Sequence, residues 1–366
     1  MAGLIVVLVL IVLGAGVCGF LAQPSFGRLP SGERLERIRM SPNYRDGAFR
    51  NRVPTPMMTG EKNRWRILAE FIFSDRRGLR PERPVAVVRP DLKHLPDSNL
   101  MVWFGHSSYL LQIDGRRILV DPVFRMASPV SFVNRPFAGT DVFRPEDMPD
   151  IDLLIITHDH WDHLDYKTVK ALRNRIRKVV CPLGVGAHLE YWGYDPDRLC
   201  ELDWDEQTEV EGLVVHCLPT RHFSGRGLAS NRTLWGSFLV EAPSLSAFIG
   251  GDGGYGPHFE EIGRRFPKID WAILENGQYS ENWKFIHTMP CLLGKAAADL
   301  RAKQVVTVHH SKYALSSHPW DEPLKNARDL KSSAEASVSI PSIGEILFLT
   351  GGERMVECAS CTGAGR

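Results

Sequence analysis

The sequence carries no excess charge of either sign. Its 366 residues include 44 Lys and Arg against 43 Asp and Glu, which gives a formal net charge of +1. Proteins that bind polynucleotides without sequence preference present a basic surface to the phosphates. We therefore expect no nucleic acid partner.

The sequence also lacks the dense, even set of cysteines that stabilises small secreted modules. Its seven cysteines are scattered along the chain, and we expect most of them to be reduced thiols. Cys358 and Cys361 form a CxxC pair near the C-terminus. Because no second pair and no histidine stands nearby at zinc-site spacing, we interpret this pair as part of an ordinary tail.

Charge is missing altogether from one stretch at the N-terminus, between Leu4 and Ala22. A helix of this length rises roughly 28 Å, close to the thickness of the hydrocarbon core of a bilayer. A cleaved signal peptide is the alternative, but the stretch has no basic n-region and no clear small-x-small cleavage site. Val17 also disfavours lipoprotein processing before Cys18, where a small residue is usual. We therefore expect residues 1–22 to be an uncleaved membrane anchor.

Arginines follow this stretch, whereas only the α-amino group precedes it. They are Arg28, Arg34, Arg37 and Arg39. The positive-inside rule then places the rest of the chain on the cytoplasmic side of the membrane.

Residues 23–98 are rich in Pro, Arg and Gly and show no sustained hydrophobic period, apart from a short helical candidate at 65–73. We expect an N-terminal arm that wraps the main domain and tethers it to the anchor. Contact of this arm with substrate or lipid is the alternative.

After Leu100 the sequence changes to short apolar runs bounded by turn residues, which are typical of strands. The predicted strands are 100–104, 109–113, 117–120, 151–157, 178–181, 213–218, 237–240, 247–249, 271–274 and 304–308. Helices are predicted at 166–176, 184–192, 259–266 and 289–301. This alternation indicates an α/β domain over residues 99–355, followed by a tail over 356–366.

A dense group of imidazoles and carboxylates directly follows the strand predicted at 151–157. The segment HDHWDH places His158, His160, Asp162 and His163 on one tight loop. These ligand types suit zinc, iron or manganese, and this spacing can direct them at two adjacent ions. A single His or Asp is explained equally well by a helix cap or a turn. Burying all of them at a strand end is costly unless a cation compensates, so we predict a metal site.

Three further predicted strands end near a His or Asp, namely His222, Asp252 and His309. Each alone could be an ordinary polar residue, but ligands at the ends of rigid strands are how an α/β scaffold holds a site. His310 is a rival to His309. Because strand alternation sends neighbouring side chains to opposite faces, only one of the two is expected to bind metal.

The order HxHxDH, then His, Asp and His after successive strands, resembles the metallo-β-lactamase superfamily. The resemblance implies an αββα sandwich with the site at one edge of both sheets. The ligand set that it implies is one metal on His158, His160 and His222, a second on Asp162, His163 and His309, and Asp252 bridging both.

Four shorter motifs narrow this resemblance: WFGHSS at 103–108, Asp121-Pro122, LWGS at 234–237 and GDGGY at 251–255. They look like the N-acylphosphatidylethanolamine-hydrolysing phospholipase D branch and its bacterial relatives, over residues 100–323. The function implied is hydrolysis of a phosphodiester in such a lipid. Enzymes similar to ascorbate-phosphate lactonase share much of the pattern.

Two divalent ions, with zinc as the expected metal, would share a water molecule and lower its pKa. Asp162, Asp252 and His287 are the candidate catalytic residues, and His287 would protonate or bind the leaving group. The candidate substrate contacts are Arg221, Arg226, Gln278, Tyr279 and His287. We expect Asp159 and Asp165 to orient the ligand histidines, since metal-bound imidazole commonly donates its other N–H to a carboxylate.

The leading hypothesis is thus a membrane-anchored hydrolase with a phospholipid substrate. A lactonase or phosphoesterase for a small soluble metabolite is the first alternative. An iron-dependent redox enzyme on the same fold is an alternative of another class. A non-catalytic metal-binding protein is disfavoured because the ligand set looks complete, and a homodimer is left open.

Overall fold

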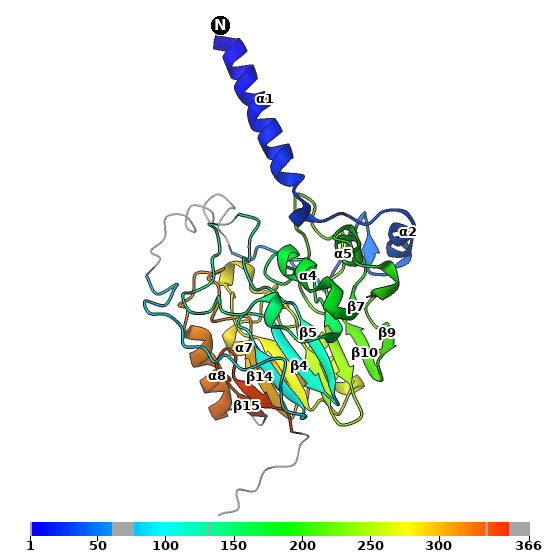
Figure 1. The fold of residues 1–366 in the computed structure, drawn as a ribbon, viewed down its shortest axis with the longest axis vertical. Coiled ribbons are helices and arrows are strands. Elements are labelled where there is room, and N and C mark those ends of the chain that lie inside the picture. Colours follow the sequence, from blue (N-terminus) through cyan, green and yellow to red (C-terminus); the bar gives the residue numbers. More distant parts are fainter. Residues whose placement is uncertain (1, 61–76, 131, 334–335, 351–366) are drawn as a thin grey trace, which may run out of the picture.

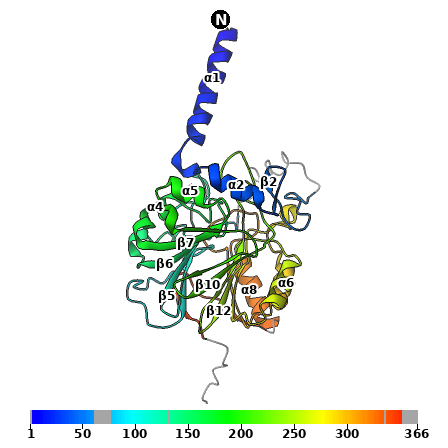
Figure 2. The ribbon, with the colours of Figure 1, turned by 90° about the vertical axis from the view of Figure 1, so that its right-hand side faces the viewer.

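The computed structural model describes residues 2–60, 77–130, 132–333 and 336–350 (Figure 1). In this part of the chain two seven-stranded sheets carry the fold, with helices on their outer sides (Figures 1 and 2). The predicted αββα sandwich is confirmed.

The first sheet is antiparallel at one end and parallel at the other. Its order is β16-β3-β4-β5-β6-β7-β8, and the strands from β5 to β8 run parallel. The bounds are β16 Ile346–Phe348, β3 Leu100–Trp103, β4 Tyr109–Ile113, β5 Arg116–Val120, β6 Ile151–Ile155, β7 Ile176–Pro182 and β8 Leu199–Leu202.

The second sheet has the order β9-β10-β11-β12-β13-β14-β15. It is antiparallel from β9 to β12 and parallel from β12 to β15. The bounds are β9 Gln207–Val210, β10 Leu213–Leu218, β11 Ser237–Glu241, β12 Ser246–Ile249, β13 Trp271–Glu275, β14 Gln304–Val308 and β15 Ser337–Ser339.

Helices cover both sandwich faces. In Figure 2, α4 (Tyr166–Leu172) lies on the side of β5 to β7, and α6 (His258–Arg265) and α8 (Glu322–Ser333) lie on the side of β12. The core has a main cluster that includes strands of both sheets, and a second cluster where β12 to β15 meet α6, α7 (Pro290–Asp299) and α8. Apolar residues in consecutive strand positions are thereby buried from both sides, as expected for strands inside a sandwich.

All ten predicted strands are confirmed, and so are the four predicted helices with shifted ends, including α5 (Gly186–Tyr191). The prediction did not find β8, β9, β15, β16 or α8. Two of these elements lack a strong apolar signal: β9 has the sequence QTEV with two exposed residues, and α8 reads EPLKNARDLKSS. Others are apolar but short, such as β16 with the three residues ILF. The limits of the domains stay predictions.

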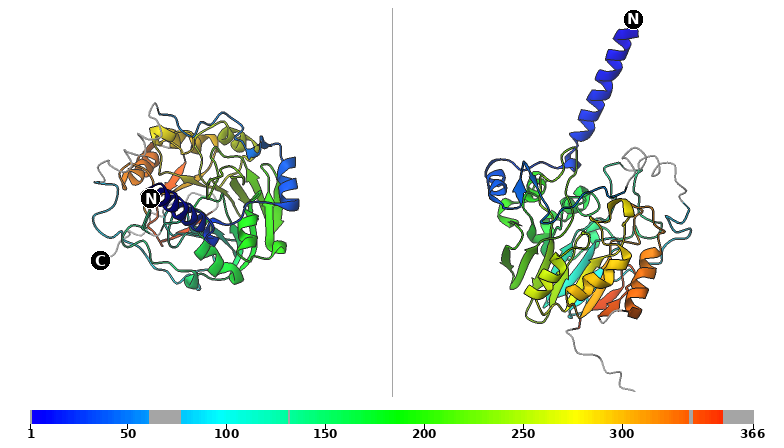
Figure 3. Two further views of the ribbon diagram at one scale, coloured as in Figure 1. Left: turned by 90° about the horizontal axis from the view of Figure 1, so that it is seen from above. Right: turned by 180° about the vertical axis from the view of Figure 1, so that it is seen from behind.

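The N-terminal segment begins with helix α1 (Ala2–Leu21), which projects away from the sandwich (Figures 1 and 3). Within the described residues it is the one helix long and apolar enough to cross a membrane, and the qualifying stretch is Gly3–Leu21. It meets the body through a 3₁₀ turn, η1 (Pro24–Phe26). By length and composition the helix fits the predicted anchor.

The arm contains regular structure that the sequence analysis did not predict. Helix α2 (Gly32–Met40) is followed by a hairpin of β1 (Tyr44–Arg45) and β2 (Ala48–Phe49). The helical candidate at 65–73 lies outside the described residues, as do Cys358 and Cys361.

Candidate metal centre

The predicted metal loop lies where β6 ends and α4 begins. Asp165 is the N-cap of α4, because its carboxylate accepts hydrogen bonds from the Lys167 backbone N–H at 3.1 Å and from the Thr168 hydroxyl. Asp165 therefore fixes the helix start. The prediction that it orients a ligand histidine is wrong, since its carboxylate is occupied by the helix.

Three imidazole nitrogens of the predicted ligand set converge at one point. His160 Nδ1 lies 2.9 Å from His158 Nε2 and 3.3 Å from His222 Nε2. The His158 and His222 side chains are almost completely buried. The arrangement brings together residues 62 positions apart, as three nitrogen donors to one cation would require.

A second group forms around Asp252. His163 Nε2 lies 3.1 Å from Asp252 Oδ2 and 3.6 Å from Asp162 Oδ2, and His309 Nδ1 lies 3.2 Å from Asp252 Oδ1. Asp252 Oδ2 is also 3.9 Å from His158 Nε2. The Asp252 carboxylate thus lies between the two groups, where a bridging ligand belongs.

Several atoms of these groups lack partners within the described chain. His163 Nε2, His309 Nε2 and Asp252 Oδ1 are buried side-chain atoms without a hydrogen bond. Buried polar groups in native proteins are almost always paired, so such a concentration at one place calls for a missing partner. Imidazole and carboxylate donors suit zinc, iron and manganese. The residues present therefore fit divalent metal ions.

The charges of the site also favour the binding of a cation. Burial raises the pKa of Asp252, yet His163 and His309 hold it well below its usual range. Burial also lowers the pKa of His163, yet Asp252, Asp162 and Asp121 hold it well above its usual value. The carboxylates thus create a field that strongly favours a positive charge at this position.

Buried partners fix the orientation of the candidate ligands. Asp121 Oδ2 lies 2.7 Å from His163 Nδ1 and accepts a 2.6 Å hydrogen bond from the Thr157 hydroxyl. His222 Nδ1 lies 2.7 Å from the backbone oxygen of Ile286. An N–H at Nδ1 leaves the Nε2 lone pair of each ring directed at the site, which is the tautomer that a metal requires.

The predicted orienting role of Asp159 is corrected. Its carboxylate accepts hydrogen bonds from the Gly225 backbone N–H at 2.7 Å and the Thr233 hydroxyl at 2.9 Å, and lies 3.1 Å from His188 Nε2. Asp159 therefore holds the loop after His222 against the metal loop. The role expected of Asp159, orienting a ligand histidine, is performed by Asp121, which lies against His163. Asp121 belongs to the Asp121-Pro122 motif.

The geometry separates His309 from His310. His310 Nδ1 lies 2.8 Å from the Ser311 hydroxyl and its ring packs 4.8 Å from Trp103, so it points away from the other ligands. The His309 backbone has a left-handed φ of 68°. Such a conformation costs energy in a non-glycine residue and is typical of functional sites.

Two buried residues in contact with the site were not predicted. His106 Nε2 lies 2.9 Å from Asp162 Oδ2, and Glu275 Oε2 lies 2.6 Å from His287 Nδ1. His106 belongs to the WFGHSS motif, and Glu275 ends the apolar strand β13. A polar residue at the end of an apolar strand, as Glu275 is, is the same pattern that identified His222, Asp252 and His309.

Residues 116–310 match the family described as Beta-lactamase superfamily domain. The chain belongs to the metallo-β-lactamase superfamily. Its metal-dependent hydrolase fold carries the HxHxDH loop within the matched region.

Two relatives are similar over most of the chain. An uncharacterised protein of Mycobacterium tuberculosis is 38% identical over 321 residues, which cover 86% of each chain. The N-acyl-phosphatidylethanolamine-hydrolyzing phospholipase D 1 of Caenorhabditis elegans is 30% identical over 302 residues, which cover 75% of this chain and 84% of the relative.

A solved structure shows a similar fold. The diiron β-hydroxylase CmlA of Streptomyces venezuelae has a TM-score of 0.55 at 17% identity, covering 70% of this chain and 55% of that protein. At this identity the likeness concerns the fold alone.

Of the predicted substrate contacts, His287 lies beside the candidate metal ligands. Its ring centroid is 5.2 Å from that of His222 and 5.3 Å from that of His309. Burial lowers its pKa, but the Glu275 carboxylate raises the pKa to about 8. A protonated imidazole at the rim of the centre can donate a proton.

The other predicted substrate contacts are occupied by internal partners. Arg226 is buried and donates to the backbone oxygens of Ser25, Asp159 and Leu164. Arg221 donates to Pro54, Thr55 and Tyr255, Gln278 to His309 and Tyr313, and Tyr279 to Glu322. These contacts give all four residues a structural role, and their contact with substrate stays a prediction.

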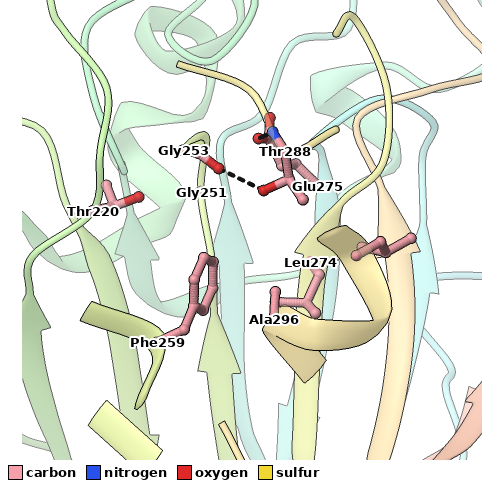
Figure 4. A pocket seen from close by; sticks show the side chains of 10 residues that line it. Thr220, Gly251, Gly253, Phe259, Leu274, Glu275, Thr288 and Ala296 are labelled. Atoms are coloured by element: carbon pink, nitrogen blue, oxygen red, sulfur yellow. Dashed lines mark hydrogen bonds between the residues drawn. The ribbon is translucent and has the colours of Figure 1, made fainter. Parts of the chain in front are cut away.

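A small cavity lies behind the Asp252 loop, lined by Gly253, Phe259, Glu275, Thr288 and their neighbours (Figure 4). Its volume of about 10 Å³ is close to that of one water molecule, so it holds no substrate. The Thr288 hydroxyl donates a 2.7 Å hydrogen bond to the Gly253 oxygen (Figure 4). This wall supports the Asp252 loop from the side of α6 and α7.

Proposed function

We propose that this protein is a membrane-anchored phosphodiesterase that hydrolyses N-acylphosphatidylethanolamine or a related phospholipid, with a dinuclear zinc centre. The observation that carries the proposal is the position of Asp252 between two groups of imidazoles. One ion would be held by His158, His160 and His222. The other would be held by Asp162, His163 and His309, and Asp252 would contribute to both sites. When bound, the two ions would supply an activated water and stabilise negative charge on a phosphoryl group.

The chain's own residues contribute orientation and a proton. Asp121 fixes the tautomer of His163, as Ile286 does for His222. His287, charged through its contact with Glu275, is placed to donate a proton to the leaving oxygen. The two nitrogens of His287 then have separate tasks, Nδ1 toward the carboxylate and Nε2 toward substrate.

A lipid substrate is supported by the way the apolar helix joins the metal loop. The Phe26 ring lies 5.0 Å from Trp161, which stands within the HxHxDH motif. Arg226 donates to the Ser25 oxygen at 2.8 Å and to the Leu164 oxygen at 2.7 Å, so one side chain ties the segment after α1 to the metal loop. A bilayer that contains α1 would therefore lie next to the centre, and a tether raises the local concentration of lipid.

The phospholipase named in the C. elegans relative gives the substrate class. The basic residues after α1 support a cytoplasmic position of the domain. The M. tuberculosis relative shares more of the sequence but carries no named activity.

The test is hydrolysis by the zinc-loaded full chain in nanodiscs. We expect release of phosphatidic acid and N-acylethanolamine from N-acylphosphatidylethanolamine, in excess over turnover of soluble phosphodiesters and lactones. Asp252→Ala is expected to abolish the reaction while the folded protein is retained. Preferential turnover of a soluble lactone, or oxygen consumption by an iron-loaded preparation without lipid hydrolysis, would contradict the proposal.

A further inference from the structure

A groove of about 430 Å³ opens between the N-terminal arm and the loop that carries His222. Its walls are residues 49–55 and Met57 of the arm, together with His222, Phe223 and Asn231. Small-molecule sites typically have volumes of roughly 300–1,000 Å³. The groove thus adjoins a candidate metal ligand and is large enough for part of a substrate.

The arm is fastened to the metal centre at this ligand. The Asn51 side chain pairs with the backbone of His222: its amide donates to the His222 oxygen at 2.7 Å and its oxygen accepts from the His222 N–H at 3.2 Å. Arg221 Nη2 donates to the Pro54 oxygen at 2.6 Å, and Arg221 Nε to the Thr55 hydroxyl at 3.0 Å. The arm is therefore a fixed wall of the groove.

The groove has an apolar lining that reaches the candidate ligands. Met57 is 36% exposed, whereas Phe49 is fully buried and presents no surface to a ligand. The ring of Phe223 lies 4.4 Å from that of His160 and 4.9 Å from that of His222. An alkyl chain that leaves the metal centre would find apolar contacts along this path.

Two arginines line the groove, and they differ in whether the guanidinium is paired. Arg52 is paired with Asp205 and lies over the Trp204 ring. Arg50 is exposed, and among the described residues its guanidinium has no hydrogen bond or ion pair. A free guanidinium beside an apolar lining matches an amphiphile that bears an anionic group.

We infer that the groove binds an acyl chain of an anionic lipid whose phosphodiester lies at the metal centre, with Arg50 on the side of the groove from which that negatively charged headgroup enters. The inference rests on the proposed function and adds the arm as the part of the chain that selects the lipid. Asn51 is a positioning residue in this account, because it acts through His222.

Photocrosslinking of the full chain in nanodiscs tests this directly. The probes are N-acylphosphatidylethanolamines with a diazirine either in the N-acyl chain or in a glycerol-ester chain. We expect one of the two probes to label peptides that contain residues 49–57 or Phe223, and Met57→Trp to reduce that labelling because the indole fills the groove. Met40→Trp, at an exposed methionine of α2, is the matched control.

Chain-length selectivity gives a second readout. Each buried methylene changes affinity by about fourfold, so blocking about two methylenes by Met57→Trp should lower the ratio of kcat/KM for long over short N-acyl or ester chains by roughly fifteenfold. Arg50→Gln should raise KM about two- to fivefold, as expected for one exposed ionic contact. Arg45→Gln, an exposed arginine of β1, should not raise KM.

Two results would overturn the groove assignment in a protein that still hydrolyses lipid. One is labelling confined to other segments, and the other is labelling and chain-length selectivity that Met57→Trp leaves unchanged. Labelling of residues 49–57 without hydrolysis of any phosphodiester would instead overturn the proposed function alone.

Discussion

Replacing Asp121 with asparagine tests the support of the metal centre without changing its volume. Asp121 Oδ1 accepts from the Thr157 backbone N–H at 2.8 Å, and Oδ2 serves both the Thr157 hydroxyl and His163 Nδ1. In Asp121→Asn the oxygen keeps the contact with the Thr157 backbone. The amide NH₂ then faces His163 Nδ1–H, so two donors oppose each other.

The imidazole can restore a hydrogen bond only by moving its proton to Nε2, the atom that faces Asp252. That proton removes the lone pair that a metal needs. A buried donor without a partner costs about 1–3 kcal/mol. Loss of such a supporting contact typically lowers metal affinity about 10–100-fold. Both magnitudes agree, since a tenfold change corresponds to about 1.4 kcal/mol.

The assay is a zinc titration against a competing chelator, with the metal content measured at each step. We expect Asp121→Asn to bind one zinc ion nearly as the natural chain does and the other about 10–100-fold more weakly. The control is Asp150→Asn, at an exposed position. Two ions bound with unchanged affinity in Asp121→Asn would refute the assigned role of Asp121.

Three further predictions follow from other parts of the site and fold. His287→Gln should lower kcat at least about tenfold with the zinc content retained, measured by single-turnover hydrolysis and metal analysis. Arg226→Met should release the segment after α1, seen as faster proteolysis near Ser25 and slower turnover of lipid in nanodiscs than of a soluble phosphodiester. Burial lowers the pKa of Lys312 from 10.5 to about 8, so the folded protein binds fewer protons than the unfolded chain in this window. Its stability should rise by up to about 3 kcal/mol from pH 8 to 10.5, and Lys312→Met should lose this slope in denaturant unfolding.

The sequence predicted the parts of the fold that carry a strong local signal. Strands such as β6 and β14 are uninterrupted apolar runs, and the polar residues at their ends were recognised as ligand candidates on that basis. The alternation of side-chain directions predicted that only one of His309 and His310 binds metal, but it did not say which. In each case a few neighbouring residues contain the whole signal.

The contacts that complete the site join distant residues, and no local pattern contains them. Asn51 and His222 are 171 positions apart, and Asp121 meets His163 across 42 positions. Arg221 and Arg226 were chosen for their closeness to His222 in sequence. In an irregular loop that closeness does not fix the direction of a side chain, and both point to backbone oxygens of the N-terminal arm.

Anomalous diffraction from crystals of the zinc-loaded protein tests the central claim most directly. We expect two peaks about 3.5–4 Å apart, one beside His158 and one beside His163, with the Asp252 carboxylate between them. A single peak, or peaks that lie away from Asp252, would contradict it.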